Sequence, residues 1–132
     1  MADKNNKIIS MAFDEPFYRK MAAQKWKQQD FKKAADYYSK VLELSPEDFD
    51  IQLNYAQCLV KLGFGSRAEH LFYENIINDR HVADSFYELS QLNIELNEPN
   101  KAFLFGINYV LITNDQDLSL IHISEPTRQA EI

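Results

Sequence analysis

A histidine and a glutamate one helical turn apart are the residues of this chain whose spacing most resembles a metal site. His70 and Glu74 are four positions apart, which would place both side chains on one face of a helix. Zinc sites built on this spacing add a second histidine or a cysteine. No second histidine accompanies the pair in a binding motif, and His81 lies in a predicted turn. We therefore expect surface polar residues here and no metal site.

The other residues with catalytic potential have simpler explanations. Cys58 lies on a predicted helix face with no adjacent cation to lower its pKa, which favours a role in core packing. Glu47 and Asp48 fit a turn followed by a helix start, where negative charge is favourable. Gly63 and Gly65 are typical of a turn, because no strand precedes them and no Lys-Ser/Thr pair follows. The sequence predicts a protein that is not an enzyme and uses no cofactor.

A pattern of small and apolar residues returns every 34 residues. Windows that begin at Glu15, Phe49 and Ala83 each have an apolar residue at the seventh place, a small residue at the eighth and alanine at the twentieth. A fixed period of this length is typical of stacked helical repeats. A bulky residue at either small position would hold paired helices apart. These positions hold Met21, Tyr55 and Leu89, then Ala22, Ala56 and Ser90, and then Ala34, Ala68 and Ala102.

Capping residues and helix breakers predict six helices. Asp14 is expected to cap the first helix after a polar lead over residues 1–14, with Pro16 in its first turn. Asp30 caps the second helix and Pro46 stops it. Gly63 suits the left-handed position that ends a helix. The short connections require antiparallel neighbours. The expected ranges are about 16–28, 31–44, 49–62, 65–78, 83–96 and 99–113.

These repeats resemble the tetratricopeptide repeat (TPR) family. The segment from Gln29-Asp30-Phe31-Lys32-Lys33-Ala34 through Tyr38 to Leu44-Ser45-Pro46 is similar to the second half of that repeat. The resemblance covers residues 15–116 as three repeats, 15–48, 49–82 and 83–116. It implies an all-α TPR solenoid of three antiparallel helix pairs, and a protein that binds protein or peptide partners as a scaffold or adaptor. Lys25 and Asn93 replace the family's usual tyrosine.

Charge and cysteine content narrow the environment and the partners. The net charge of −6 over 132 residues argues against general nucleic-acid binding. Residues 1–41 hold nine Lys/Arg and five Asp/Glu, a balance of +4, whereas residues 42–117 hold four and thirteen, a balance of −9. Cys58 is the single cysteine, and no segment resembles a signal peptide or a membrane span. We expect a cytoplasmic protein that does not enter membranes.

The resemblance implies a partner-binding groove lined by the first helix of each pair. Trp26 and Tyr87 are the expected anchors, because large rigid aromatic side chains contribute much of the energy of interfaces. Packing within the repeat framework is the alternative for both. The predicted groove is basic at one end and acidic at the other. Its residues are Arg19, Lys20, Trp26, Lys27, Leu53, Asn54, Gln57, Asp84, Tyr87, Glu88 and Gln91.

Three other functions are alternatives to a general adaptor that binds partners in this groove. Some TPR cochaperones grip a chaperone's C-terminal carboxylate with basic residues and asparagine, but Ala23, Asp84 and Glu88 occupy positions that this clamp needs. Two carboxylates would repel such a ligand. The basic run from Arg19 to Lys33 could contact RNA, although solvated helix faces explain it better. The chain could also be the sensory or regulatory portion of a larger regulator or enzyme.

The C-terminal residues break the repeat pattern. Residues 118–128, LSLIHISEPTR, resemble the translated end of a sequencing-library adapter, so we expect residues 118–132 to be a non-native tail that does not belong to the fold. The last predicted helix includes Phe103–Ile112, which is apolar nearly all round and needs a cover. We therefore expect a C-terminally truncated array, and self-association through this helix.

Overall fold

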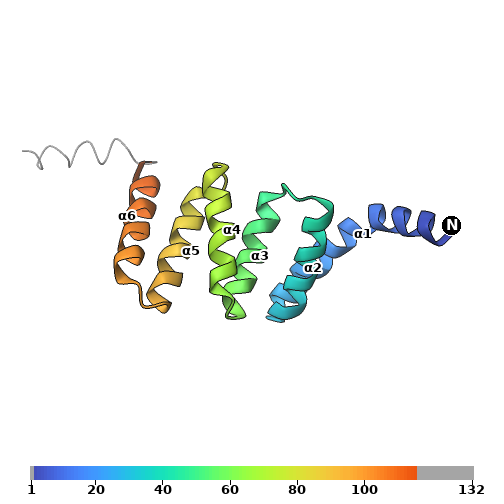
Figure 1. Cartoon of the computed structure of the whole chain (residues 1–132), viewed down its shortest axis with the longest axis horizontal. Coiled ribbons are helices and arrows are strands. Elements are labelled where there is room, and N and C mark those ends of the chain that lie inside the picture. The colour runs from blue at the N-terminus through green and yellow to red at the C-terminus, as the bar shows by residue number, and fades with distance from the viewer. Residues whose placement is uncertain (1, 116–132) are drawn as a thin grey trace, which may run out of the picture. The chain divides into compact units, whose positions relative to one another are not determined.

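The computed structural model describes the backbone of residues 2–115 and the side chains of residues 14–114, and every regular element in that part of the chain is a helix (Figure 1). The helices fall into two compact units, α1–α4 in residues up to His81 and α5–α6 from Val82 onward. The all-α fold is therefore confirmed. The helices are α1 (Ala2–Lys27), α2 (Phe31–Leu44), α3 (Phe49–Lys61), α4 (Gly65–Ile77), α5 (Val82–Glu95) and α6 (Pro99–Asp115).

In the first unit each helix packs against the next along the chain, so that α1–α2 and α3–α4 form antiparallel pairs. The small residues of the repeat, Ala22, Ala34, Ala56 and Ala68, are completely buried, as their spacing predicted. Larger side chains occupy the space beside them, and Phe72 is among the fully buried ones. Close helix approach at alanine therefore forms the framework of this unit.

The 34-residue period recurs in the backbone at the turn inside each helix pair. Gln29, Gly63 and Asn97 stand 34 residues apart and all have positive φ angles, of 62°, 88° and 61°. A left-handed residue at this place lets the next N–H bond back to the helix that has just ended. Those bonds run from Asp30, Phe64 and Glu98 to the carbonyls of Lys25, Leu59 and Asn93, at 2.9, 2.8 and 2.8 Å.

Two predicted helix starts are confirmed by their hydrogen bonds. The Asp30 carboxylate accepts from the backbone N–H of Lys33 at 3.3 Å, and Asp48 accepts from that of Ile51 at 3.1 Å. Such caps satisfy backbone donors that have no partner inside the helix. Phe64, at the start of α4, makes no side-chain cap.

The first helix begins much earlier than predicted. Because α1 starts at Ala2, the helix start expected at Asp14 is wrong. Pro16 lies inside the helix, where it deprives the carbonyl of residue 12 of its usual donor. Residues 2–13 contain neither glycine nor proline, so nothing in their composition ends the helix before that point.

The second unit is the pair α5–α6. Leu89 is completely buried and Ala102 is 6% exposed, and the Ser90 hydroxyl donates to the Ala102 carbonyl at 2.9 Å. A Cβ atom at Gly106 would lie 3.2 Å from the Ser90 hydroxyl oxygen, so glycine allows close approach here. Asn93, which replaces the family's tyrosine, is buried and donates to the Leu89 carbonyl at 2.8 Å. The segment 118–132 lies outside the described residues.

Candidate functional site

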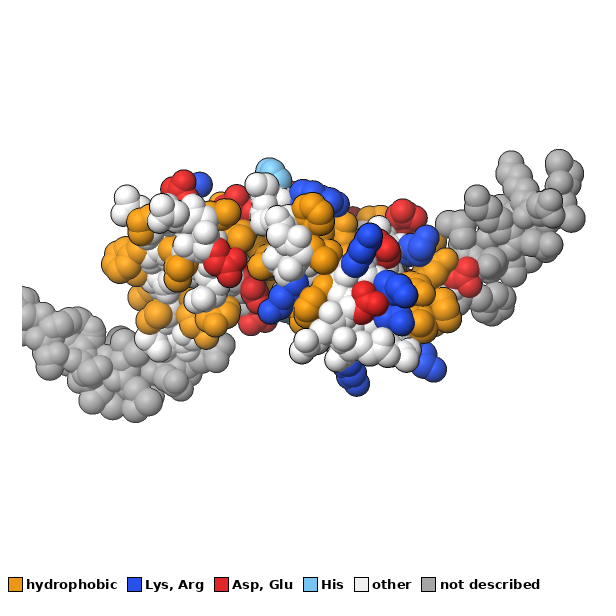
Figure 2. Space-filling view, turned by 90° about the horizontal axis from the view of Figure 1, so that it is seen from below, with side chains coloured by type: hydrophobic (Ala, Val, Ile, Leu, Met, Phe, Trp, Pro, Cys, Tyr) orange, Lys and Arg blue, Asp and Glu red, His pale blue; other side chains and the backbone are white. Residues whose placement is uncertain are grey.

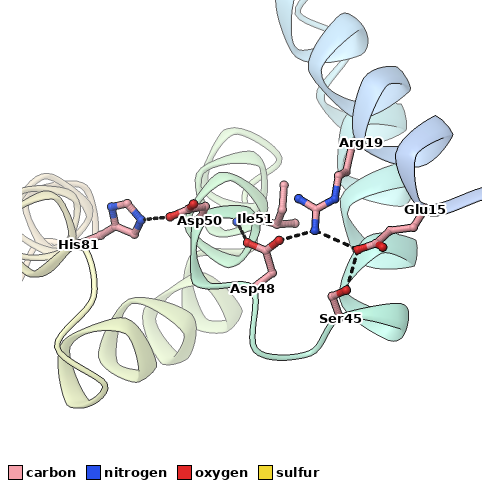
Figure 3. Close-up of polar contacts among 7 residues, drawn as sticks. All are labelled: Glu15, Arg19, Ser45, Asp48, Asp50, Ile51 and His81. Atoms are coloured by element: carbon pink, nitrogen blue, oxygen red, sulfur yellow. Dashed lines mark hydrogen bonds and ion pairs between the residues drawn. The ribbon is translucent and has the colours of Figure 1, made fainter.

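Arg19, a predicted groove residue, is held in a network at the start of α3 (Figure 3). Its guanidinium donates to Glu15 on the same helix at 2.9 Å and to Asp48, the cap of α3. The Ser45 hydroxyl, just after α2, donates to the same Glu15 oxygen at 2.6 Å. Arg19 therefore ties α1 to the turn between α2 and α3.

Hydrogen bonds shift the pKa values of this network toward the charged forms. The Ser45 hydroxyl and then Arg19 lower the pKa of the Glu15 carboxyl. Burial alone would raise the pKa of Asp48, but hydrogen bonds from Arg19 and from the Ile51 N–H outweigh it and lower that pKa. Bonds to Asp48 and Glu15 raise the pKa of Arg19. These groups are therefore charged near neutral pH, and their ion pairs hold α1 against the turn between α2 and α3.

Of the other predicted groove residues on α1, Trp26 is partly packed against neighbouring side chains, whereas Lys20 and Lys27 face solvent. Trp26 is half-buried against the core of the first unit, and its ring meets the Phe31 ring edge-on with 5.1 Å between centroids. The packing alternative therefore applies to part of this side chain. Lys20 and Lys27 are exposed. Their ammonium groups give this face of α1 its positive charge.

On α3 the predicted groove residues are more enclosed. Leu53 is only 8% exposed, so little of its side chain is available to a partner. Asn54 and Gln57 are half-exposed and present amide groups. This face therefore offers polar recognition more than apolar contact.

The α5 face of the second unit is the most open part of the predicted groove. Tyr87 is 46% exposed and lies against Tyr109 of α6 with 5.4 Å between ring centroids. Asp84 and Gln91 are exposed beside it along the helix, and Glu88 is half-exposed. An aromatic ring among acidic groups suits a partner that presents basic and apolar side chains.

Cys58 and His81, whose side chains could serve chemistry, have structural roles. Cys58 is completely buried, and burial raises the pKa of its thiol to about 12. Its predicted core position is thus confirmed. Within the described residues, His, Cys, Asp and Glu form no group of three that could hold a metal ion. His81 instead pairs with the Asp50 carboxylate, 31 positions away (Figure 3). No local sequence signal identified this pairing.

Exposed side chains of α5 and α6 line an apolar groove. The apolar run 103–112 predicted an uncovered helix, and Phe103, Leu104 and Leu111 are 66%, 59% and 62% exposed. The structure adds that α5 contributes Ile94, which is 60% exposed, and that the groove is open with a volume of about 590 Å³. The run 103–112 alone does not indicate this groove, because its second wall comes from another helix.

Successive helix pairs with a 34-residue period define an all-α helical-repeat protein. Residues 25–75 match the tetratricopeptide repeat family. The solved structure titled "Crystal structure of MamA protein" shares the fold, with a TM-score of 0.62 and 22% sequence identity over 83% of this chain. The match over residues 25–75 and the shared fold support a tetratricopeptide repeat protein, and repeats of this kind form protein–protein interaction modules.

The chain corresponds to 63% of the length of the MamA chain, less than two thirds of it. The search of curated proteins gave no significant match. No helix in the described part of the chain is both long and apolar enough to cross a membrane.

Proposed function

We propose that this chain is a non-catalytic adaptor that binds protein or peptide partners on the first-helix faces of its repeats. The observation that supports this most directly is the α5 face, where Tyr87 is 46% exposed beside Asp84 and Gln91. An exposed aromatic ring costs little entropy to order and commonly anchors an interface. The exposed Lys20 and Lys27 would extend recognition on α1. A cytoplasmic location belongs to this proposal, since the single cysteine suits a reducing compartment.

The proposal also sets the charge of the partner. Lys20 and Lys27 would contact acidic side chains, whereas Asp84 and Glu88 would contact basic ones. A chaperone's terminal carboxylate is therefore a poor ligand for the α5 face. Nucleic acid is likewise not the expected ligand of these faces.

A peptide-display selection against the full chain tests the proposal. Selected peptides should bind with micromolar affinity in calorimetry, and Tyr87→Ala should weaken them by about tenfold or more. Asn54→Ala should weaken those that contact α3, while the same change at Asn108, on the second helix of its pair, serves as the matched control. Charge reversal at Asp84 and Glu88 should raise the off-rate of basic peptides. Peptides insensitive to all of these changes would refute the groove assignment.

A further inference from the structure

The turns of the first unit gather charge of one sign along one edge. The ends of α1 and α3 and the starts of α2 and α4 lie at the same edge, because successive helices are antiparallel (Figure 1). Figure 2 looks onto this edge, and Lys and Arg side chains gather over the first unit there. Within residues 25–33 and 61–67 six cations and one carboxylate, Asp30, give a balance of +5. We call this the basic edge, and its cations are Lys25, Lys27, Lys32, Lys33, Lys61 and Arg67.

The opposite edge has the reverse charge. It contains the end of α2, the start of α3 and the end of α4. Within residues 43–50 and 74–80 six carboxylates and one cation, Arg80, give a balance of −5. Glu15 and Arg19 of α1 add one charge of each sign through their network. We call this the acidic edge, and its carboxylates are Glu43, Glu47, Asp48, Asp50, Glu74 and Asp79.

The first unit is almost neutral overall, although each of its two edges has a strong charge. Residues 14–81 hold ten Lys/Arg and eleven Asp/Glu, a balance of −1. The chain's acidic excess is therefore not on this unit, and two copies of the unit do not repel through their net charge. Opposite charges at the two ends of helices about 20 Å long form a strong dipole.

We propose that the basic edge of one chain docks on the acidic edge of a second copy. Charge complementarity supports this occupant, because both surfaces belong to the same unit and carry equal and opposite balances. The basic edge has the inter-helix turns 28–30 and 62–64, and the acidic edge has the turn 45–48 and the segment 78–81 that follows α4.

The aromatic rings on the basic edge favour a protein partner over a nucleic acid. Base stacking needs open ring faces. Lys61 lies over the Phe31 ring, with its Nζ 5.8 Å from the centroid, and the Trp26 ring packs against the same ring at an interplanar angle of 70°. Arg67 lies over the Phe64 ring at 5.7 Å. A cation over each ring competes with a base for that ring, although Phe64 is still 49% exposed.

Two double variants test the proposal, and in each the new charges are placed where they do not destabilise the helices. Lys32→Glu with Lys33→Glu places negative charge in the first turn of α2, and Glu43→Lys with Glu74→Lys places positive charge in the last turns of α2 and α4. Each change suits the helix dipole, so both variants should fold. Lys40→Glu with Lys101→Glu matches the net charge of the first variant and leaves the basic edge intact.

Sedimentation of the full chain provides the measurement. Every chain compared, the parent included, carries Leu104→Glu with Leu111→Glu, which removes association through the apolar α6 face. The average mass should rise with concentration at low salt and fall toward the monomer value at high salt, because the Debye length shrinks to about 3 Å at 1 M. Each edge variant alone should associate about tenfold more weakly than the parent chain. Their mixture should form a 1:1 complex, because one variant keeps the acidic edge and the other the basic edge. The charge-matched control should associate like the parent.

Three results would overturn the proposal. Association that survives in both edge variants would place the contact elsewhere. A mixture that associates no better than its components would exclude docking of opposite edges. Binding of a single-stranded oligouridine to the basic edge, lost in Lys32→Glu with Lys33→Glu, without any self-association of the parent chain, would assign this edge to nucleic acid.

Discussion

Replacing Ala22 by leucine, with the same change at Ala23 as the control, isolates the role of the small residues in the repeat. Ala22 is completely buried between helices, whereas its neighbour Ala23 is exposed. Leucine adds three carbon atoms, and in a closely packed site such additions cost about 1–3 kcal/mol because neighbouring side chains and backbone must shift. On a solvent face the same change should stay within about 0.5 kcal/mol, since alanine and leucine are both strong helix formers.

Thermal and urea unfolding followed by tryptophan fluorescence measures this difference. The single tryptophan, Trp26, lies one turn from Ala22 on α1, so its signal reports the first unit. The melting temperature of the Ala22→Leu variant should fall by about 4–8 °C for each kcal/mol lost, and Ala23→Leu should melt like the parent chain. Equal stability of the two variants would refute the view that alanine is required for close helix approach.

Three further predictions follow from the described contacts. Folding lowers the pKa values of Glu15 and Asp48, so their carboxylates stabilise the fold above the ordinary pKa values of 4.5 and 3.8, and this stabilisation is lost as pH falls through the folded values. The Arg19→Met variant should lose less stability on acidification. Urea melts across this pH range should show a difference of about 1 kcal/mol or less, because these ion pairs are partly solvated. The Cys58 thiol should resist a thiol-specific reagent in the folded chain at mildly alkaline pH and react in denaturant, because burial raises its pKa to about 12; rapid reaction of the native chain would contradict its buried position. Association through the apolar α6 face should persist at high salt and be removed by Leu104→Glu with Leu111→Glu, as measured by light scattering; a salt-resistant oligomer in that variant would exclude this face.

Local rules predicted most of the helix boundaries. The expected range 31–44 is the observed α2, and the other internal helices differ from expectation by one residue or so at their ends. Caps and left-handed residues such as Asp30 and Gly63 act within one turn of the chain, so their effects are visible in the sequence. The sequence does not locate the start of α1, because Pro16 suits both a helix start and, at some cost, a helix interior.

The candidate groove was less predictable than the fold. A 34-residue period identifies the helix faces, but it does not say how far each side chain is used in packing. Leu53 is buried, Trp26 packs against Phe31, and Arg19 donates a hydrogen bond to Asp48 at the start of another helix. Burial of this kind depends on neighbours that are distant in sequence.

The sequence by itself determined that this protein is a helical repeat, because small residues at a fixed period of 34 allow paired helices to approach closely in each repeat. It also contained the charges of both edges, but scattered over more than fifty residues. Only the tertiary structure decided that these charges separate into a basic and an acidic edge, since antiparallel helices bring alternate turns to the same end. It likewise decided that Asp50 meets His81 and that Ile94 completes the apolar groove, because both depend on which helices become neighbours.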